Sequence, residues 1–349
     1  MSPLQHQLTR PQDATDDGPT IIDIRRDKTA VSLEADIVAG LKGADGAEKT
    51  LPTMLLYSAA GLKLFEDITY LDEYYLTNTE IALLERDAAA MAARIPDNAV
   101  VLELGSGNLR KVEILLAALR AQGKTIDYYA LDLDVGELRR TLGMLPAAPG
   151  SVRYRGLHGT YDDGRAWLRA AADRPRCVLW LGSSVGNFER RAAAGFLRAF
   201  AGDALRAGSA DCMLVAIDGC KAPARVHAAY NDARGVTAQF ILAGLAAANG
   251  ILGAEHFRAA EWRYVGEWNA ALARHQAYYV ATADVRFDGA LAGLSVRRGE
   301  RVNIEYSYKF DAADARLLWD DAGLVASAQW ANARGDYRAR PPPPPRGPR

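Results

Sequence analysis

Residues 100–111 carry the strongest fold signal in the chain, because they combine an apolar run, a glycine turn and the start of an amphipathic helix. The run at residues 100–104 is typical of a buried strand, and helical periodicity begins near Leu109. Open α/β sheets build ligand sites where such a strand passes through a glycine turn into a helix. Glycine lets a ligand approach the backbone closely, because it has no Cβ. The segment therefore predicts a ligand-binding strand–turn–helix unit in an α/β sheet.

The sequence of this turn also restricts the ligand. It reads Glu-x-Gly-x-Gly, from Glu103 to Gly107, and lacks the third glycine of the dinucleotide fingerprint. A carboxylate at Glu103 repels a pyrophosphate, so the pattern favours a ligand without phosphates. S-adenosylmethionine (SAM) fits, since it offers an amino acid, a ribose and an adenine. We expect the cofactor-binding residues of the turn to be Glu103, Gly105, Ser106 and Gly107. A strand–turn–helix that binds no ligand is the alternative interpretation.

The next predicted strand, at residues 126–132, ends in acidic side chains. An acid in this position can accept hydrogen bonds from both hydroxyls of a ribose. Asp132 is the first candidate for this role. Asp134 is the second, because it can equally cap a helix that starts at Val135. The two stretches together predict a SAM site.

Composition limits the class of protein. The chain of 349 residues is long enough for one large domain or two ordinary ones, and its 49% hydrophobic and 24% charged residues are typical of a globular protein. A net charge of −1 gives no electrostatic footprint for nucleic acid or an anionic membrane. The three cysteines have neither disulfide-framework nor zinc-site spacing, and no segment reads as a membrane span or signal peptide. We expect a cytoplasmic monomer or homodimer that binds a small molecule and no metal.

Strands and helices alternate from about residue 81 to residue 215, which predicts a parallel sheet. A helical region and two long strands, at 275–283 and 303–310, then predict an additional α+β lobe over the carboxyl edge of this Rossmann-like sheet. The expected divisions are a disordered lead-in at 1–18, an N-terminal helical part of the substrate pocket at 19–85, a SAM-binding core at 86–215, a substrate-binding lobe at 216–310, a return to the core at 311–336, and a proline- and arginine-rich tail at 337–349.

Tyrosines are concentrated shortly before the glycine turn, among them Tyr74 and Tyr75. A phenol can donate or accept a hydrogen bond from an apolar wall, so these side chains are candidates for a substrate pocket, with core packing as the alternative. Thr77 or Thr79 predicts a helix N-cap, and Thr77 with Glu80 has the spacing of a capping box.

A further buried strand is predicted to end at Leu181, and the polar segment at residues 182–187 follows it. Asn187 offers a donor and an acceptor for a substrate carboxylate or amine, or it caps the helix that follows. Tyr230 ends a predicted helix and either faces the same cleft or packs in the core. Glu305 and Ser307 share one face of the last long strand, which either meets a substrate or faces solvent.

Together these motifs resemble the SAM-dependent amino-acid N-methyltransferases. That family includes the histidine-specific enzymes of ergothioneine biosynthesis and fungal enzymes that methylate tryptophan or 4-dimethylallyltryptophan. The resemblance covers about residues 21–335 and implies a class I methyltransferase sheet, a SAM cosubstrate and an amino-acid substrate. The segments that carry it are LPTMLLY (51–57), EYYLT (73–77), ELGSGNLRK (103–111), YALDL (129–133), GTYDDG (159–164), LGSSVGN (181–187) and YND (230–232).

The resemblance also implies roles for single residues. The SAM-binding positions are Gly105, Lys111, Asp132, Thr160 and Tyr161. The positions of the amino-acid pocket are Tyr57, Tyr74 or its neighbour Tyr75, Gly182, Asn187 and Tyr230, and those that contact imidazole in the histidine enzymes are Glu305 and Ser307. Tyr57 and Asn187 are the candidates to hold the reacting amine. The Thr160–Tyr161 pair stands where the bacterial histidine enzymes have Asp–Phe.

Two branches of the family compete for this chain. A chain without a second catalytic domain, with the segments GLHGTY (156–161) and WLGSS (180–184), looks more similar to the indole-alkaloid branch. Glu305 and Ser307 favour histidine. We therefore expect methylation of the α-amino nitrogen of tryptophan or 4-dimethylallyltryptophan, with histidine as the alternative.

Other functions remain open at this point. A non-catalytic SAM-binding protein would use the same sheet. So would a nicotinamide-dependent oxidoreductase, although the missing third glycine argues against it. No general base is evident, and His158 is a candidate by residue type alone. The residues after Tyr337 lack the apolar character expected of a closing strand.

Overall fold

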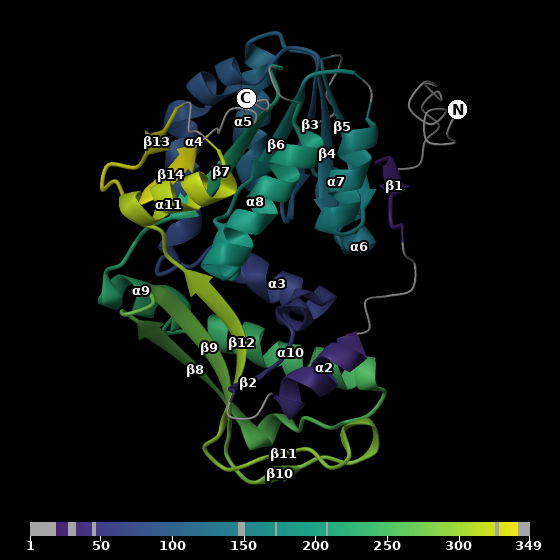
Figure 1. The fold of residues 1–349 in the computed structure, drawn as a ribbon, viewed down its shortest axis with the longest axis vertical. Helices are drawn as coiled ribbons and strands as arrows, with labels where there is room; N and C mark the ends of the chain where they lie inside the picture. Colours follow the sequence, from purple (N-terminus) through teal and green to yellow (C-terminus); the bar gives the residue numbers. More distant parts are fainter. Residues whose placement is uncertain are drawn as a thin grey trace.

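The chain forms an upper domain built on a large sheet and a lower domain built on a smaller sheet (Figure 1). The lead-in expected at 1–18 and residues 341–349 of the expected tail lie outside the described residues. The computed structural model describes residues 19–26, 33–43, 47–145, 151–171, 173–206, 209–324 and 328–340.

The upper sheet has eight strands. In spatial order they are β1 (Ile21–Asp23), β5 (Val152–His158), β4 (Ile126–Asp132), β3 (Ala99–Leu104), β6 (Arg176–Trp180), β7 (Cys212–Asp218), β14 (Tyr337–Arg340) and β13 (Trp330–Ala331). In this spatial order, each of the first six strands, β1, β5, β4, β3, β6 and β7, is parallel to its neighbour in that group. β14 is antiparallel to both β7 and β13. From β3 the chain moves outward to β4 and β5, then returns to the other side with β6 and β7. A topological switch point therefore lies between β3 and β6, and the predicted Rossmann-like α/β fold is confirmed.

Helices cover both faces of this sheet. One layer consists of α4 (Tyr75–Arg94), α5 (Arg110–Ala121) and α6 (Val135–Leu142), and the other of α7 (Tyr161–Ala170), α8 (Arg190–Ala204) and α11 (Ala312–Ala322). Successive side chains of a strand alternate between the layers, so Val101 packs with the first and Leu102 with the second, and both are fully buried. Because both faces are covered, the parallel strands read as apolar runs in the sequence.

The lower domain combines a four-stranded sheet with helical segments. The sheet order is β2 (Lys49–Thr50), β12 (Arg301–Tyr308), β9 (Arg274–Ala281) and β8 (Trp262–Asn269), and a hairpin adds β10 (Val285–Arg286) and β11 (Ser295–Val296). The helical segments are α2 (Leu33–Lys42), the 3-10 helix η1 (Thr53–Tyr57), α3 (Ala59–Ile68), α9 (Pro223–Tyr230), α10 (Val236–Leu252), and the short turns η3 (Ala259–Glu261) and η4 (Gly289–Leu291). The Tyr279 hydroxyl of β9 donates to the Ile241 carbonyl of α10 at 2.6 Å. A Cβ on Gly244 would lie 2.4 Å from that hydroxyl, so glycine allows α10 to approach the sheet.

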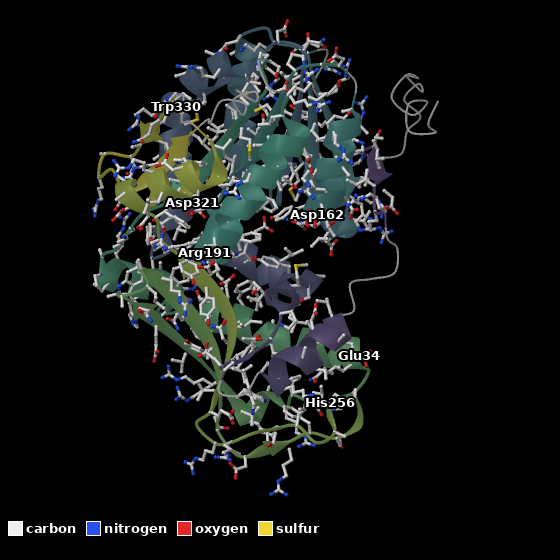
Figure 2. All side chains as sticks on the ribbon, in the orientation of Figure 1. Glu34, Asp162, Arg191, His256, Asp321 and Trp330 are labelled. Atoms are coloured by element: carbon white, nitrogen blue, oxygen red, sulfur yellow. The ribbon has the colours of Figure 1, made fainter. Side chains whose placement is uncertain are left out.

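The two domains meet at the N-terminal end of α8. Figure 2 labels Arg191 at this level, below Asp321 and Trp330 of the upper domain and above Glu34 and His256 of the lower one. The Arg190 guanidinium donates to the Lys309 carbonyl at 3.1 Å. The 3-10 helix η2 (Ser184–Asn187), which follows β6, packs directly on β12. The carboxyl end of β6 therefore faces the lower domain.

Two local expectations are wrong at the start of α4. The helix begins at Tyr75 with Tyr74 as its N-cap residue, so Thr77 lies inside the first turn and neither Thr77 nor Thr79 is the cap. The Glu80 carboxylate is buried and contacts residues far along the chain, so the predicted capping box with Thr77 does not form. The contacts of Glu80 with Gly182 and Lys111 form in place of the predicted local contact with Thr77.

Three boundaries of the expected divisions also differ. β1, in the segment assigned to the substrate pocket, pairs with β5 in the upper sheet. Helix α4 continues across the boundary at residue 85. The expected tail begins later than residue 337, because Tyr337–Arg340 form β14, in which Tyr337 and Ala339 are buried on alternate positions.

Within the described ranges, no helix is long and apolar enough to span a membrane, and no group of three or more His, Cys, Asp or Glu side chains is placed to hold a metal ion.

Candidate active site

The glycine turn after β3 needs glycine for two reasons. Gly105 and Gly107 have φ angles of +63° and +54°, in the left-handed region that side chains with a Cβ rarely adopt. A Cβ on Gly105 would also lie 2.8 Å from the Tyr161 hydroxyl, whereas a Cβ on Gly107 would meet nothing within 4 Å. The Gly105 amide donates to the Leu131 carbonyl at 3.0 Å, which ties the turn to the end of β4.

Asp132 lies at the end of β4, next to this turn. Its Oδ1 accepts from the Leu133 amide at 2.7 Å, and burial raises the pKa of the carboxyl above its usual value. Asp134 is the N-cap of α6 and accepts from the Glu137 amide at 2.8 Å. Since Asp134 is committed to the cap, Asp132 remains the candidate for a ribose.

The other predicted cofactor residues divide into two kinds. The Thr160 hydroxyl donates to Asp163 at 2.8 Å in the capping box of α7, so it is committed to the helix. Glu103 is buried within the sheet and accepts the Tyr128 hydroxyl, and burial raises its pKa to about 8. Ser106 is different, because its buried Oγ has no hydrogen-bond partner among the described residues.

These residues fit SAM. An open glycine turn, an unpaired buried hydroxyl at Ser106 and a carboxylate at Asp132 match a ligand with a polar amino-acid end and a ribose. Burial keeps the Tyr161 phenol protonated, with its pKa raised to about 12, so it offers a neutral polar group beside the turn.

Lys111 and Gly182 are joined by Glu80, a residue whose role the sequence did not reveal. The Lys111 ammonium lies 2.6 Å from Glu80 Oε2, and the Gly182 amide donates to the same carboxylate at 2.9 and 3.1 Å. The Glu80 side chain is 2% exposed. One buried carboxylate therefore connects the first turn of α5, on the cofactor side, with the strand end that was predicted for the amino acid.

Tyr57, Asn187 and Glu305 come together from three separate elements. The Asn187 amide, in η2, lies 3.2 Å from the Tyr57 hydroxyl of η1 and 3.4 Å from Glu305 Oε1 on β12. Glu189 caps α8, so the alternative role of Asn187 as that cap is wrong. Burial raises the pKa of Tyr57 well above 10 and that of Glu305 to about 7.

Tyr230 and Ser307 form a second polar contact among the residues predicted for the amino acid. Their hydroxyl oxygens are 2.7 Å apart, and both side chains are buried. The Lys309 ammonium and the Asp218 carboxylate lie directly behind them. Since Ser307 and Lys309 are buried, the alternative that this face of β12 is solvated is wrong.

Tyr74 and Tyr75 have different surroundings. The Tyr74 ring packs edge-on against Tyr230 at 6.1 Å, whereas the Tyr75 hydroxyl donates to Asp218 Oδ2 at 2.6 Å. Tyr74 therefore contacts the predicted substrate residue Tyr230 directly, whereas Tyr75 contacts Asp218. The predicted candidate base His158 contacts the Leu133 carbonyl at 3.0 Å, so its Nε2 is a donor and not a base.

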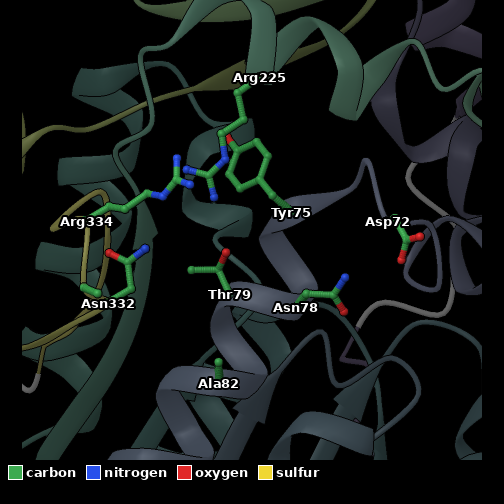
Figure 3. A pocket seen from close by; sticks show the side chains of 9 residues that line it. Asp72, Tyr75, Asn78, Thr79, Ala82, Arg225, Asn332 and Arg334 are labelled. Atoms are coloured by element: carbon green, nitrogen blue, oxygen red, sulfur yellow. The ribbon is translucent and has the colours of Figure 1, made fainter.

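A separate surface cavity of about 390 Å³ lies on the outer side of Tyr75 (Figure 3). Arg225 stacks on the Tyr75 ring at 4.0 Å and pairs with Asp336 at 2.6 Å, next to Arg334 and Asn332. Apart from Tyr75, its lining contains none of the predicted site residues.

Comparison with known proteins adds an independent line of evidence. The profile of a family described as "Histidine-specific methyltransferase, SAM-dependent" matches residues 33–340. The chain is 47% identical over 330 residues to ergothioneine biosynthesis protein 1 of Neurospora crassa, covering 93% of this chain and 36% of that protein. It thus spans about a third of the length of that relative. It is 38% identical over 322 residues to the 4-dimethylallyltryptophan N-methyltransferase of Aspergillus fumigatus, covering 89% of this chain and 94% of that protein.

Proposed function

The chain belongs to the family of histidine-specific, SAM-dependent methyltransferases, and on this premise we propose that it methylates the α-amino nitrogen of histidine. Family membership makes it a SAM-dependent methyltransferase and sets aside the oxidoreductase and the non-catalytic alternatives. Between the two substrates that the sequence suggests, the higher identity to the ergothioneine protein favours histidine over the indole.

The observation that carries the proposal is the pair of polar groups on β12. Imidazole carries one N–H donor and one nitrogen acceptor in its neutral form. The Glu305 carboxylate can accept from the first, and the Ser307–Tyr230 hydroxyl pair can donate to the second. A dimethylallyl-substituted indole offers no nitrogen acceptor and would leave buried polar groups unpaired, which is costly.

The reaction needs positioning more than it needs a protein nucleophile. SAM supplies a methyl group bonded to a positively charged sulfur. The α-amine of the substrate must be neutral to attack this methyl group. Tyr57, Tyr74 and Tyr230 keep their protons, because burial raises the pKa of each well above 10. They therefore act as neutral hydrogen-bond partners, while Asn187 orients the amine. Fixing the amine in line with the methyl group supplies most of the acceleration.

Mass spectrometry of reactions with SAM and histidine, tryptophan, 4-dimethylallyltryptophan or tyrosine tests the proposal. We expect methylated histidine as the main product. A second candidate, methylation of an indole substrate, is favoured by coverage of 94% of the Aspergillus relative. Methylation of tryptophan or its dimethylallyl derivative without methylation of histidine would overturn the proposal.

The pH dependence offers a second test at Glu305. The ionised Glu305 carboxylate accepts the imidazole N–H, and burial raises the pKa of Glu305 to about 7. We therefore expect kcat/KM for histidine to rise as pH increases through 7. Glu305→Gln should lower kcat/KM about tenfold or more and make that rise shallower, because the part that comes from Glu305 is lost, while binding of S-adenosylhomocysteine (SAH) stays intact. A variant with the same pH profile as the wild type would contradict the role of Glu305.

A further inference from the structure

Lys309 places a buried ammonium directly behind the two hydroxyls of the pocket. Its side chain is 1% exposed, and Nζ lies 2.8 Å from Tyr230 Oη, 3.2 Å from Ser307 Oγ and 2.8 Å from Asp218 Oδ2. We propose that Lys309, held by Asp218, is a positioning residue that makes the Tyr230–Ser307 pair a hydrogen-bond donor to the substrate side chain. The inference rests on the proposed function, in which these hydroxyls meet the amino acid.

Asp218 fixes the orientation of this ammonium. Its side chain is fully buried, Oδ1 accepts from the Cys220 amide at 2.9 Å, and Oδ2 accepts from the Tyr75 hydroxyl at 2.6 Å and from Lys309. A buried ion pair is tolerated when its remaining protons and lone pairs are also satisfied. Here α4, β7, α9 and β12 all supply partners, so the ammonium cannot turn towards solvent.

The count of protons determines what the hydroxyl pair can do. An ammonium has three protons and no lone pair, and all three protons of Lys309 have an acceptor. Tyr230 and Ser307 each accept one of them, and one of these hydroxyls donates to the other across 2.7 Å. Two hydroxyl protons minus that one leave a single proton. This proton is available to an acceptor on the substrate.

The surroundings of Tyr230 prevent the pair from reorienting. The His275 ring stacks on the Tyr230 ring with centroids 4.1 Å apart and planes 11° apart, and the Tyr264 hydroxyl donates to the Tyr230 carbonyl at 2.8 Å. Burial, with the nearby charge of Lys309, lowers the pKa of His275 to about 3, so this ring is neutral and adds no competing charge. The Tyr230 ring is thus held in one orientation, with its hydroxyl beside Ser307 and Lys309.

The consequence concerns substrate choice. A neutral imidazole can accept the free proton through its ring nitrogen, whereas an indole N–H can only donate. Because Lys309 fills one acceptor position on each hydroxyl, the pair is a poor partner for a donor. A site built around such a hydrogen bond discriminates strongly against analogues that lack the matching group. Lys309 therefore contributes to the selection of histidine over tryptophan without touching either.

The test compares kcat/KM for histidine and tryptophan in the wild type, in Lys309→Met and in the double variant Lys309→Met/Asp218→Asn. Methionine removes the ammonium, and asparagine removes the carboxylate that would otherwise be left buried and unpaired. We expect the ratio of histidine to tryptophan to fall about tenfold or more in both variants, with an increased KM for histidine. SAH affinity, measured by calorimetry, should stay the same.

Lys221→Met is the matched control, because Lys221 pairs with Asp311 and Asp314 in a half-exposed cluster at the start of α11. It should leave the ratio unchanged. If Lys309→Met does not fold, the double variant decides. A wild type that methylates histidine, with an unchanged ratio in the folded variants, overturns this inference alone. A wild type that methylates tryptophan and not histidine overturns the proposed function as well.

Discussion

The buried link between Lys111 and Glu80 yields a quantitative prediction. Lys111→Met keeps the length of the side chain but removes the ammonium that lies 2.6 Å from Glu80. The Glu80 carboxylate, 2% exposed, then keeps the Gly182 amide as a partner but has lost its counter-ion. A buried charge without its counter-ion destabilises the folded state, so the free energy of unfolding should fall.

The exposed fractions set the size of the effect. Removing one partner of a fully buried ion pair costs about 3–5 kcal/mol. The Lys111 side chain is 22% exposed, so water can reach the vacated position, and we expect the lower end of that range, about 3 kcal/mol. Glu80→Gln in the same chain removes the unpaired charge while keeping an acceptor for the Gly182 amide. The double variant should recover at least half of the loss.

Urea unfolding of the wild type, both single variants and the double variant at pH 7 measures these free energies and their coupling. Arg258→Met is the control, because its pair with Glu261 is exposed on the arginine side by 66% and should contribute less than about 1 kcal/mol. The reasoning is refuted if Lys111→Met costs less than 1 kcal/mol (about the value of a surface pair). It is also refuted if the double variant is no more stable than Lys111→Met alone.

Three further substitutions test other parts of the site. Asn187→Ala should raise KM for histidine about tenfold to a hundredfold by removing hydrogen bonds to the amine or carboxylate, and leave SAH binding intact; equal losses in calorimetry would contradict this. Gly182→Ala should destabilise the fold by about 1–3 kcal/mol, since φ is +77° and the new Cβ would lie 2.9 Å from the Lys111 ammonium; an unchanged thermal midpoint would exclude the strain. Glu103 keeps its proton in the folded state between pH 4.5 and about 8, where the unfolded chain loses it, so unfolding free energy should fall with rising pH across that window. Glu103→Gln should flatten that dependence in denaturant titrations, and an unaltered slope would show that Glu103 does not titrate there.

The sequence was informative where a local pattern and the tertiary structure agree. The glycine turn at 105–107 requires positive φ angles, and the strands on either side are covered by helices, so both were visible as residue patterns. The cap at Asp134 could also be predicted, because an N-cap uses a side chain and amides within one turn.

The sequence was uninformative where a side chain acts at a distance along the chain. Glu80 has the spacing of a capping box but binds Lys111 and Gly182. The residues next to Glu80 in the sequence carry no pattern that predicts these contacts. Lys309 alternates with apolar residues as a solvated strand residue would. Its counter-ion, Asp218, lies at the end of β7, which is distant in the sequence and adjacent only in the folded structure. The sequence of β14 resembles a tail because its arginines and the prolines that follow obscure the two buried positions at Tyr337 and Ala339.

The position of β14 also determines when the edge of the upper sheet at β7 can close during synthesis. This strand inserts between β7 and β13, and Tyr337 is in register with Asp218, the counter-ion of Lys309. The Gly219 amide next to it donates to the Asp336 carbonyl at 2.7 Å. A ribosome that has made residues 19–324 has therefore produced the cofactor turn and both long strands of the lower domain, yet the backbone that carries Asp218 still presents an open sheet edge. Among the described residues β14 is the last strand to be synthesised, so the sheet edge beside Asp218 closes only after both long strands of the lower domain exist.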